Sequence, residues 1–485
     1  MKKIYLSLAL ALCCAIHTQA AVSVNDVVGE FSGSLFIGED SQTGNVIFLP
    51  GTQSNRITLV LPQFTFLGLN LGDIVVTNAQ MSSSGYLRIS DYPLYINILS
   101  ERAYITSDYR TSVLTGNTAA LDLTINVASV PEPIHVTFNG SRVANNAQLP
   151  NASFETNWHS VESGVEPDSW HSFNSGTGSL ISPAKNSVQL VEGSARPGST
   201  GSKCAVIKAR SVFGVCANGN ITNGQINAAS MTANSPANNY NFSDPSNTGF
   251  NTPFTALPDS FVFWVNYTNG NNSHEARMHT VITTNARYQD PEAVDYNSVK
   301  VAEATLNYAN TGGWTRKSVP FVYNSAVDSK NAAYILTTFT TNKTPGVGTT
   351  SDQVQIDDIE LIYNYQLDNF TFDGSQVSFN NGTASVNKPY ADSIYTYSTA
   401  ANGKGAKTLV GFDGANNCVV VYVLASDFAS QPSHHNVYSV QLTAPVTGLA
   451  ETATYADKAS KVVENGQIYI LRGEKCYDLL GKRIR

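Results

Sequence analysis

The sequence is poor in charged residues. Only 14% of the 485 residues are Asp, Glu, Lys or Arg, the net charge is −8, and no basic cluster occurs before the last residues. The electrostatic footprint of a nucleic-acid-binding protein is therefore missing. No phosphate loop, dinucleotide fingerprint or Gly-x-Ser-x-Gly elbow occurs in the sequence, so nucleotide chemistry and nucleophilic hydrolysis have no support from a motif.

Long apolar runs are also missing. The longest covers residues 4–16, which is short of the roughly 20 residues that span a bilayer. It follows Lys2 and Lys3 and precedes the small-residue pattern Thr18-Gln19-Ala20, an order typical of a signal peptide over residues 1–20. We expect an exported protein, secreted or at the cell surface, without a membrane span.

Cysteine is scarce as well. After the leader the sequence has Cys204, Cys216, Cys418 and Cys476, and no pair has metal-ligand spacing. In an oxidising compartment Cys204 and Cys216 are close enough in sequence to form a disulfide, and the alternative is two reduced, buried small hydrophobes. Both possibilities stay open at this stage.

What the sequence does contain is short segments that alternate apolar and polar residues, separated by Gly, Asn and Pro. This pattern predicts an all-β protein of several modules, since the chain is too long for one ordinary domain. Residues 21–145 are expected to form a small barrel filled by its own side chains. This segment resembles the calycin-like β-barrel domain of exported Bacteroidetes proteins in the stretches 28–35, 61–64, 71–74 and 134–140.

Residues 146–365 alternate in a way that predicts a two-sheet jelly-roll β-sandwich. The segment resembles the carbohydrate-metabolism domain of Bacteroidetes (PCMD) in an opening Asn-x-x-Phe-Glu and in the stretches 219–228, 263–267 and 356–363. The resemblance implies a shape related to carbohydrate-binding modules and no particular reaction.

Residues 366–445 predict a smaller, immunoglobulin-like β-sandwich, with an apolar strand at 418–423 that is buried on both faces. The last segment, 446–485, resembles the C-terminal sorting domain of the Bacteroidetes secretion route, which would make it an address or attachment device. The alternative is a final hairpin that docks on its neighbour.

Acidic residues offer two interpretations. In jelly rolls of the carbohydrate-binding type, a Glu near the opening Phe and acids on the last strand hold a structural Ca²⁺, which makes Glu155, Asp357 and Asp358 candidate ligands. The alternative is that these acids are solvated or cap loops. Strand alternation places Asp358 with Glu360 on one face and Asp357 with Ile359 on the other. No other cofactor is expected.

The segment 274–279 carries two histidines, but they are five positions apart and the zinc-protease signature needs four. We therefore expect His274 and His279 to be exposed residues of a loop and a strand.

Sugar recognition needs flat apolar faces for C–H groups and planar amides or carboxylates for hydroxyls. The preferred patch is 236–242, because a loop this polar has no core reason to carry two rings. Trp264 and Trp314 are expected in the core. The candidate glycan-binding residues are Trp158, Trp170, His171, Asn238, Asn239, Tyr240, Phe242, Asn266, Tyr267, Tyr288 and Asp290.

These observations favour non-catalytic carbohydrate binding by the jelly-roll module. The family resemblance implies the setting, which is polysaccharide handling at the cell surface. One alternative is a glycoside hydrolase or lyase that uses carboxylates in the jelly-roll cleft. Another is a structural, adhesin-like component.

Overall fold

The computed structural model describes residues 21–38, 40–162, 164–185, 189–390 and 394–444, and the backbone of 460–464, 467–472 and 475–477. Strands make up nearly all of the regular structure, so the predicted all-β class is confirmed. Within the described residues no helix is long and apolar enough to cross a bilayer. The predicted leader lies outside the described residues. So does most of the predicted tail, of which a small antiparallel sheet is described, with strands β37 (Ser460–Glu464), β38 (Gln467–Arg472) and β39 (Lys475–Tyr477).

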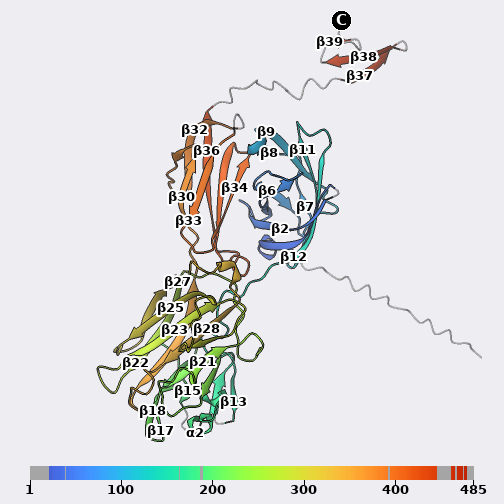
Figure 1. Cartoon of the computed structure of the whole chain (residues 1–485). Helices are drawn as coiled ribbons and strands as arrows, with labels where there is room; N and C mark the ends of the chain where they lie inside the picture. Colours follow the sequence, from blue (N-terminus) through green and yellow to red (C-terminus); the bar gives the residue numbers. More distant parts are fainter. Residues whose placement is uncertain are drawn as a thin grey trace, which may run out of the picture.

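The first module is a barrel in which each strand pairs with its neighbour (Figure 1). Alternation is strict in β11, where every second residue is buried, and the interior holds a core that includes Phe31, Phe48 and Phe138. A bridge between Tyr86, next to β7, and Val113 of β10 links the β7 end of the sheet to the strand that pairs with β11. The elements are α1 (Val24–Val27), β1 (Gly29–Ile37), β2 (Asp40–Pro50), β3 (Arg56–Leu61), β4 (Thr65–Phe66), β5 (Leu69–Asn70), β6 (Ile74–Met81), β7 (Leu87–Arg88), β8 (Tyr92–Ile96), η1 (Asn97–Leu99), β9 (Glu101–Ser107), β10 (Val113–Leu114), β11 (Thr118–Val127) and β12 (Ile134–Arg142).

The C-terminal module is a sandwich of two sheets that face each other across a core of aromatic and β-branched side chains. The apolar strand predicted around 418–423 is buried at every position, as expected. One sheet has the order β31-β30-β33 and the other β32-β36-β35-β34. Their bounds are β30 (Leu367–Phe372), β31 (Ser375–Gln376), β32 (Thr383–Pro389), β33 (Tyr397–Ala401), β34 (Lys407–Asp413), β35 (Cys418–Leu424) and β36 (His435–Ala444).

The barrel and this sandwich pack side by side, although the jelly roll separates them in sequence (Figure 1). A shared apolar cluster joins barrel residues such as Leu49 and Val60 to Tyr422 and Leu424 of the sandwich. Asp413 pairs with Leu94 across the boundary, so one sheet runs through both modules. The two modules therefore form one body.

The jelly roll has two five-stranded antiparallel sheets around a core that includes Phe154, Trp170, Phe263 and Phe339. The first sheet has the order β15-β16-β29-β22-β26, with bounds β15 (Leu190–Ser194), β16 (Lys203–Lys208), β22 (Ser260–Thr268), β26 (Thr315–Pro320) and β29 (Gln353–Ile362). The second has the order β19-β28-β23-β25-β27, with bounds β19 (Asn220–Thr222), β23 (Ala276–Thr283), β25 (Lys300–Tyr308), β27 (Val322–Tyr323) and β28 (Tyr334–Thr340).

A third sheet, β20-β21-β24, packs against the second sheet on the side away from the core. Val281 and Leu336 of the second sheet meet Tyr288 there in a separate apolar cluster. Strands β23 and β28 are consequently buried on both faces. The remaining elements are β13 (Trp158–Val161), β14 (Gly164–Pro167), η2 (Phe173–Ser175), α2 (Ile181–Lys185), β17 (Arg210–Val212), β18 (Val215–Ala217), β20 (Gln225–Ala228), β21 (Asn239–Ser243), β24 (Tyr288–Asp290) and η3 (Ser329–Asn331).

The cysteines correct one expectation. Cys204 and Cys216 are both free, so the disulfide prediction is wrong. Cys204 lies on β16 and is fully buried, and burial raises the pKa of its thiol to about 12. It acts as a small apolar side chain, which is the alternative that the sequence left open.

Candidate functional site

A cavity of about 460 Å³ opens on the jelly roll between the third sheet and the neighbouring loops. Ligand pockets in proteins are typically about 300 to 1,000 Å³. Strands β19, β20 and β21, the hairpin β17–β18 and the segment 340–346 all contribute lining residues. The cavity is therefore built where the third sheet meets the second sheet of the jelly roll.

One wall of the cavity is a buried ion network. The guanidinium of Arg277 makes two hydrogen bonds of 2.8 Å to the carboxylate of Asp290, and Nδ1 of His279 lies 3.0 Å from the same carboxylate. Burial works against the charged forms of Asp290 and His279. For Asp290 the attraction of His279 and Arg277 outweighs burial and holds its pKa far below the usual range. For His279 the carboxylate of Asp290 likewise outweighs burial and raises its pKa.

Two asparagine residues of the cavity lining each have a side-chain oxygen without a hydrogen-bond partner. Asn218 donates from Nδ2 to the carbonyl of Asn342 at 2.9 Å, and Asn220 donates to Oδ1 of Asn241 at 2.9 Å. The side-chain oxygens of Asn218 and Asn220 are both buried, and neither has a donor within the described residues. They are two of nine buried side-chain nitrogen or oxygen atoms without a hydrogen-bond partner in the described residues, and both Asn218 and Asn220 line the cavity. Native proteins rarely leave buried acceptors unpaired.

The rest of the lining is mainly apolar. Phe173 and Tyr240 contribute rings, and Ile226, Val212 and Val215 contribute aliphatic surface. A cavity with rings, branched aliphatics and a few fixed amides suits a ligand that has both C–H faces and hydroxyl groups.

Hydrogen-bond networks hold the loops around the cavity. Asn239 accepts from the backbone N–H groups of Ala229 and Ser230, and its Nδ2 donates to the carbonyls of Ser230 and Thr232. Its amide thus fixes the loop that carries Met231 into the lining.

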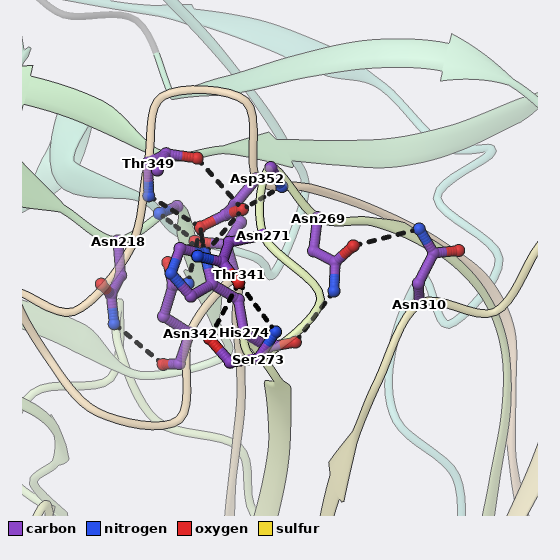
Figure 2. A network of polar contacts seen from close by, with 12 residues as sticks. Asn218, Asn269, Asn271, Ser273, His274, Asn310, Thr341, Asn342, Thr349 and Asp352 are labelled. Carbon is purple, nitrogen blue, oxygen red and sulfur yellow. Dashed lines mark hydrogen bonds and ion pairs between the residues drawn. The ribbon is translucent and has the colours of Figure 1, made fainter.

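A second network fixes the segment after β28, and Figure 2 shows it converging on Asp352. This fully buried carboxylate accepts from Asn342 at 2.8 Å and from the backbone of Gly270 and Thr349, and Nδ1 of His274 lies 2.9 Å away. Burial opposes ionisation, but these hydrogen bonds outweigh it and lower the pKa of Asp352. Because Asn342 lines the cavity, this anchor shapes its wall.

Three of the predicted glycan-binding residues line the cavity: Asn239, Tyr240 and Asp290. The preferred patch 236–242 therefore reaches the cavity in part. Tyr240 and Phe242 are half-buried and share the guanidinium of Arg287, which lies 5.4 Å and 4.9 Å from their ring centroids. Asn238 is exposed and outside the lining.

Other predicted residues do not reach the cavity. Trp170, Tyr267 and Tyr288 are fully buried, so their assignment to an exposed platform is wrong. The cause is that strand alternation gives the face of a residue but not what covers that face. Trp158 donates from its indole N–H to the carbonyl of Phe154, His171 packs on Phe250, and Asn266 pairs with Gln355 on the first sheet.

The histidines of 274–279 are not exposed, contrary to expectation. His279 is 6% exposed within the ion network, and the side chain of His274 is 10% exposed beside Asp352. The prediction that both histidines are exposed failed because the third sheet and a loop cover strand β23 and the residues just before it. Trp264 and Trp314, expected in the core, are only half-buried.

The candidate calcium ligands do not gather. Asp358 pairs with Nε of Arg196 at 2.6 Å, Asp357 accepts from the backbone N–H of Arg196 at 2.9 Å, and Glu155 accepts from Ser202 and Lys203. In the described residues no three His, Cys, Asp or Glu side chains surround a common point. Each of the three carboxylates is thus already engaged by Arg196 or by backbone N–H donors, which does not fit a ready cation site, and calcium stays a prediction.

A β-bulge also corrects the expected faces of the last strand. The register with β22 shifts between Val262 and Trp264, and Asp358 has φ +43°. Ile359 packs in the core, whereas Asp357 lies under the loop of Arg196. Burial raises the pKa of Asp357 to about 6. Asp358 and Glu360 do share a face, since both line a second cavity that includes Trp264 and Arg196.

Sequence reasoning missed most of the polar lining, including Asn218, Asn220 and Arg277. The stretch 219–228 carried a signal in its family resemblance, and it contributes Asn220, Ile226 and Asn227 to the cavity.

No family model and no curated protein matches the sequence. Among solved structures, the chain is similar to a Bacteroides thetaiotaomicron protein provisionally named a glycoside hydrolase, at 14% identity over 70% of this chain and 98% of that one, with a TM-score of 0.35. A provisionally named glycoside hydrolase from Bacteroides vulgatus matches at 14% identity over 50% of this chain and 90% of that one, with a TM-score of 0.27.

A carbohydrate-binding module specific for non-crystalline cellulose matches at 7% identity over 36% of this chain and 79% of that one, with a TM-score of 0.20. At these scores the similarities carry no argument about function. The resemblances to the calycin-like, PCMD and sorting-domain families stay predictions.

Proposed function

We propose that the jelly-roll module binds a neutral glycan in its cavity, beside the third sheet, without catalysing a reaction. The observation that carries the proposal is a cavity of about 460 Å³ with largely apolar walls, whose lining includes Asn218 and Asn220, two residues with unpaired amide oxygens. Sugar hydroxyls donate hydrogen bonds to such oxygens, while the C–H faces of the ring pack on apolar side chains.

The charges around the cavity favour a neutral ligand. The charged residues among its described lining are Arg277, Asp290 and Lys343. Arg277 and Asp290 satisfy each other, and Lys343 pairs with Glu275. An anionic sugar would have to break one of these pairs to gain a partner, which costs free energy because the ions lose their hydrogen bonds.

The carboxylates favour binding over hydrolysis. Glycosidases usually work with two carboxyl groups, one of which is an acid of raised pKa. Asp290 is the one carboxylate among the described lining residues, and its pKa is strongly lowered by His279 and Arg277 despite burial. A carboxylate held ionised in this way is a poor proton donor.

The proposed setting is the cell surface, in a system that handles polysaccharides. Support comes from the leader-like residues 1–20 and from the sorting-like tail. The barrel and the C-terminal sandwich would then present the jelly roll, which lies at the other end of the molecule (Figure 1).

The test is a glycan array with the full mature chain, repeated with chelator and with added Ca²⁺. We expect binding to neutral glycans, and dependence on Ca²⁺ would support the predicted ion. Asn218→Ala and Asn220→Ala should each weaken binding about 3- to 10-fold, the effect of one hydrogen bond.

The matched control is Asn266→Ala, which removes an amide of the first sheet that pairs with Gln355. It should leave binding unchanged, and melting curves of all variants check that the fold is kept. Absence of binding to every glycan in all conditions would overturn the proposal and favour a structural, adhesin-like role. Release of reducing ends from a bound glycan would favour the hydrolase alternative.

A further inference from the structure

The hairpin β17–β18 ends in an exposed aromatic ring beside the cavity. Phe213 is 73% exposed, and it lies in a turn in which Phe213 has φ +49° and Gly214 has φ +82°. Turns of this kind favour Asn or Asp followed by Gly, because a residue with a bulky side chain is strained at positive φ. Neither burial nor backbone preference therefore accounts for a phenylalanine at this position.

The neighbours of Phe213 connect it to the cavity. Val212 and Val215, on either side of the turn, both line the cavity, as do Cys216 and Ala217 further along β18. Part of this hairpin is thus cavity wall, and its tip projects a ring into solvent. A single exposed hydrophobe is ordinary on a protein surface, so its position beside a candidate binding cavity is what makes this ring informative.

We propose that Phe213 is a stacking platform for the second sugar unit of an oligosaccharide whose terminal unit occupies the cavity. This inference rests on the proposed function and deepens it: the ligand class becomes a neutral oligosaccharide bound at its chain end. The amide oxygens of Asn218 and Asn220 bind the terminal unit, and the chain leaves past the hairpin tip. The ring of Phe213 gives the next unit a flat apolar surface, as aromatic rings do for C–H groups.

The barrel offers a matched control. Leu67 and Gly68 form a turn of the same kind at the tip of β4–β5, with φ +49° and +77°, and Leu67 is 80% exposed. Neither Leu67 nor its strands contribute to the lining of the cavity. Leu67→Ala therefore removes an equally exposed hydrophobe from an equivalent turn, at a place where no sugar is expected.

The experiment uses neutral hexose and N-acetylhexosamine oligomers of one to four units, titrated calorimetrically into the full mature chain and its variants. Phe213→Ala should weaken binding of the two- to four-unit oligomers about 3- to 10-fold, the range for one aromatic contact. It should leave the affinity for monosaccharide unchanged. Phe213→Trp should restore oligomer binding, and Leu67→Ala should change neither.

The outcomes distinguish failure of the platform from failure of the proposed function. Equal weakening of monosaccharide and oligomer by Phe213→Ala would mean that the ring only supports the hairpin, and would overturn the platform. Unchanged oligomer binding in Phe213→Ala, with loss in Asn220→Ala, would overturn the platform and leave the proposed function standing. A wild-type chain that binds none of the oligomers would overturn both.

Discussion

The boundary between barrel and sandwich and the cavity of the jelly roll both bury polar groups, but they treat them differently. At the boundary, Asp413 is 2% exposed and both its carboxylate oxygens are used, since it accepts from Thr77 at 2.7 Å, from Tyr92 at 2.6 Å and from Asn416 at 2.8 Å. At the cavity, the amide oxygens of Asn218 and Asn220 have no donor among the described residues. The carboxylate at the boundary is thus matched within the chain, whereas the two amide oxygens of the cavity lining are not.

The ion network of Arg277, Asp290 and His279 combines features of both regions: it forms part of the cavity wall, but its charges are paired with one another. Replacing Asp290 tests how much of the jelly roll depends on that matching. Asp290→Asn removes the carboxylate that Arg277 and His279 share and leaves His279 only Glu303, 3.8 Å from its Nε2. Removing one partner of a buried pair costs about 3 to 5 kcal/mol. We expect a loss of about that size in the unfolding free energy of the jelly roll, measured by urea denaturation.

Glu360→Gln is the matched control, since Glu360 is an exposed acid of the same module. It should change the unfolding free energy by less than about 0.5 kcal/mol, as surface substitutions usually do. A loss for Asp290→Asn no larger than that of the control would show that the network contributes nothing to stability.

The boundary offers the next largest effect. Asp413→Asn keeps the size of the side chain but loses the charged acceptor that Tyr92 and Thr77 use, and a hydrogen bond to a charged group contributes about 1.5 to 3 kcal/mol. We expect the calorimetric transition of the barrel and sandwich to fall by several degrees. The jelly-roll transition and glycan binding should be unchanged, because Asp413 is not part of that module.

Asp368→Asn, at an exposed acid of the same sandwich, is the control. If Asp413→Asn shifted the jelly-roll transition equally, the molecule would unfold as one cooperative unit, and the division into two bodies would be wrong.

Strand alternation predicted the fold class well. The apolar run of β35 is buried at every position, as expected. The strict alternation of β11 shows why such patterns are informative, since burial of every second residue is a local property of a half-covered strand. The contact between barrel and sandwich could not be predicted in this way. Asp413 follows Tyr92 by 321 residues, and nothing in either segment names the other as its partner.

The site was less predictable than the fold. The segment 236–242 was recognised by its composition, although the structure places its residues from Asn239 onward in strand β21 and not in the expected loop. His279 was assigned to the surface because the sequence does not show that a third sheet covers β23. The bulge at Asp358 likewise breaks the alternation from which its neighbours were placed. Coverage by segments distant in sequence, rather than the local pattern, decides which polar residues line the cavity.

The pH dependence of the jelly roll gives the smallest and most specific test of the comparison. Although burial opposes its charge, Asp290 raises the pKa of His279 in the folded state above the value of about 6.5 in the unfolded chain. The charged imidazole therefore stabilises the fold fully below about pH 6.5, and this contribution is lost as the pH rises through the folded pKa. The lowered pKa of Asp290 acts in the opposite direction, so its contribution is present above about pH 4 and is lost only on strong acidification.

Between pH 6.5 and 8.5 the unfolding free energy of the wild-type jelly roll should fall more steeply than that of His279→Gln. One proton limits the difference in slope to about 1.4 kcal/mol per pH unit. The control is His135→Gln, at a histidine of the barrel whose side chain is 57% exposed, and it should keep the wild-type slope of the jelly-roll transition. Identical slopes for wild type and His279→Gln would mean that His279 is neutral in the folded protein. The carboxylate of Asp290 would then pair with one charged side chain, that of Arg277, rather than with two.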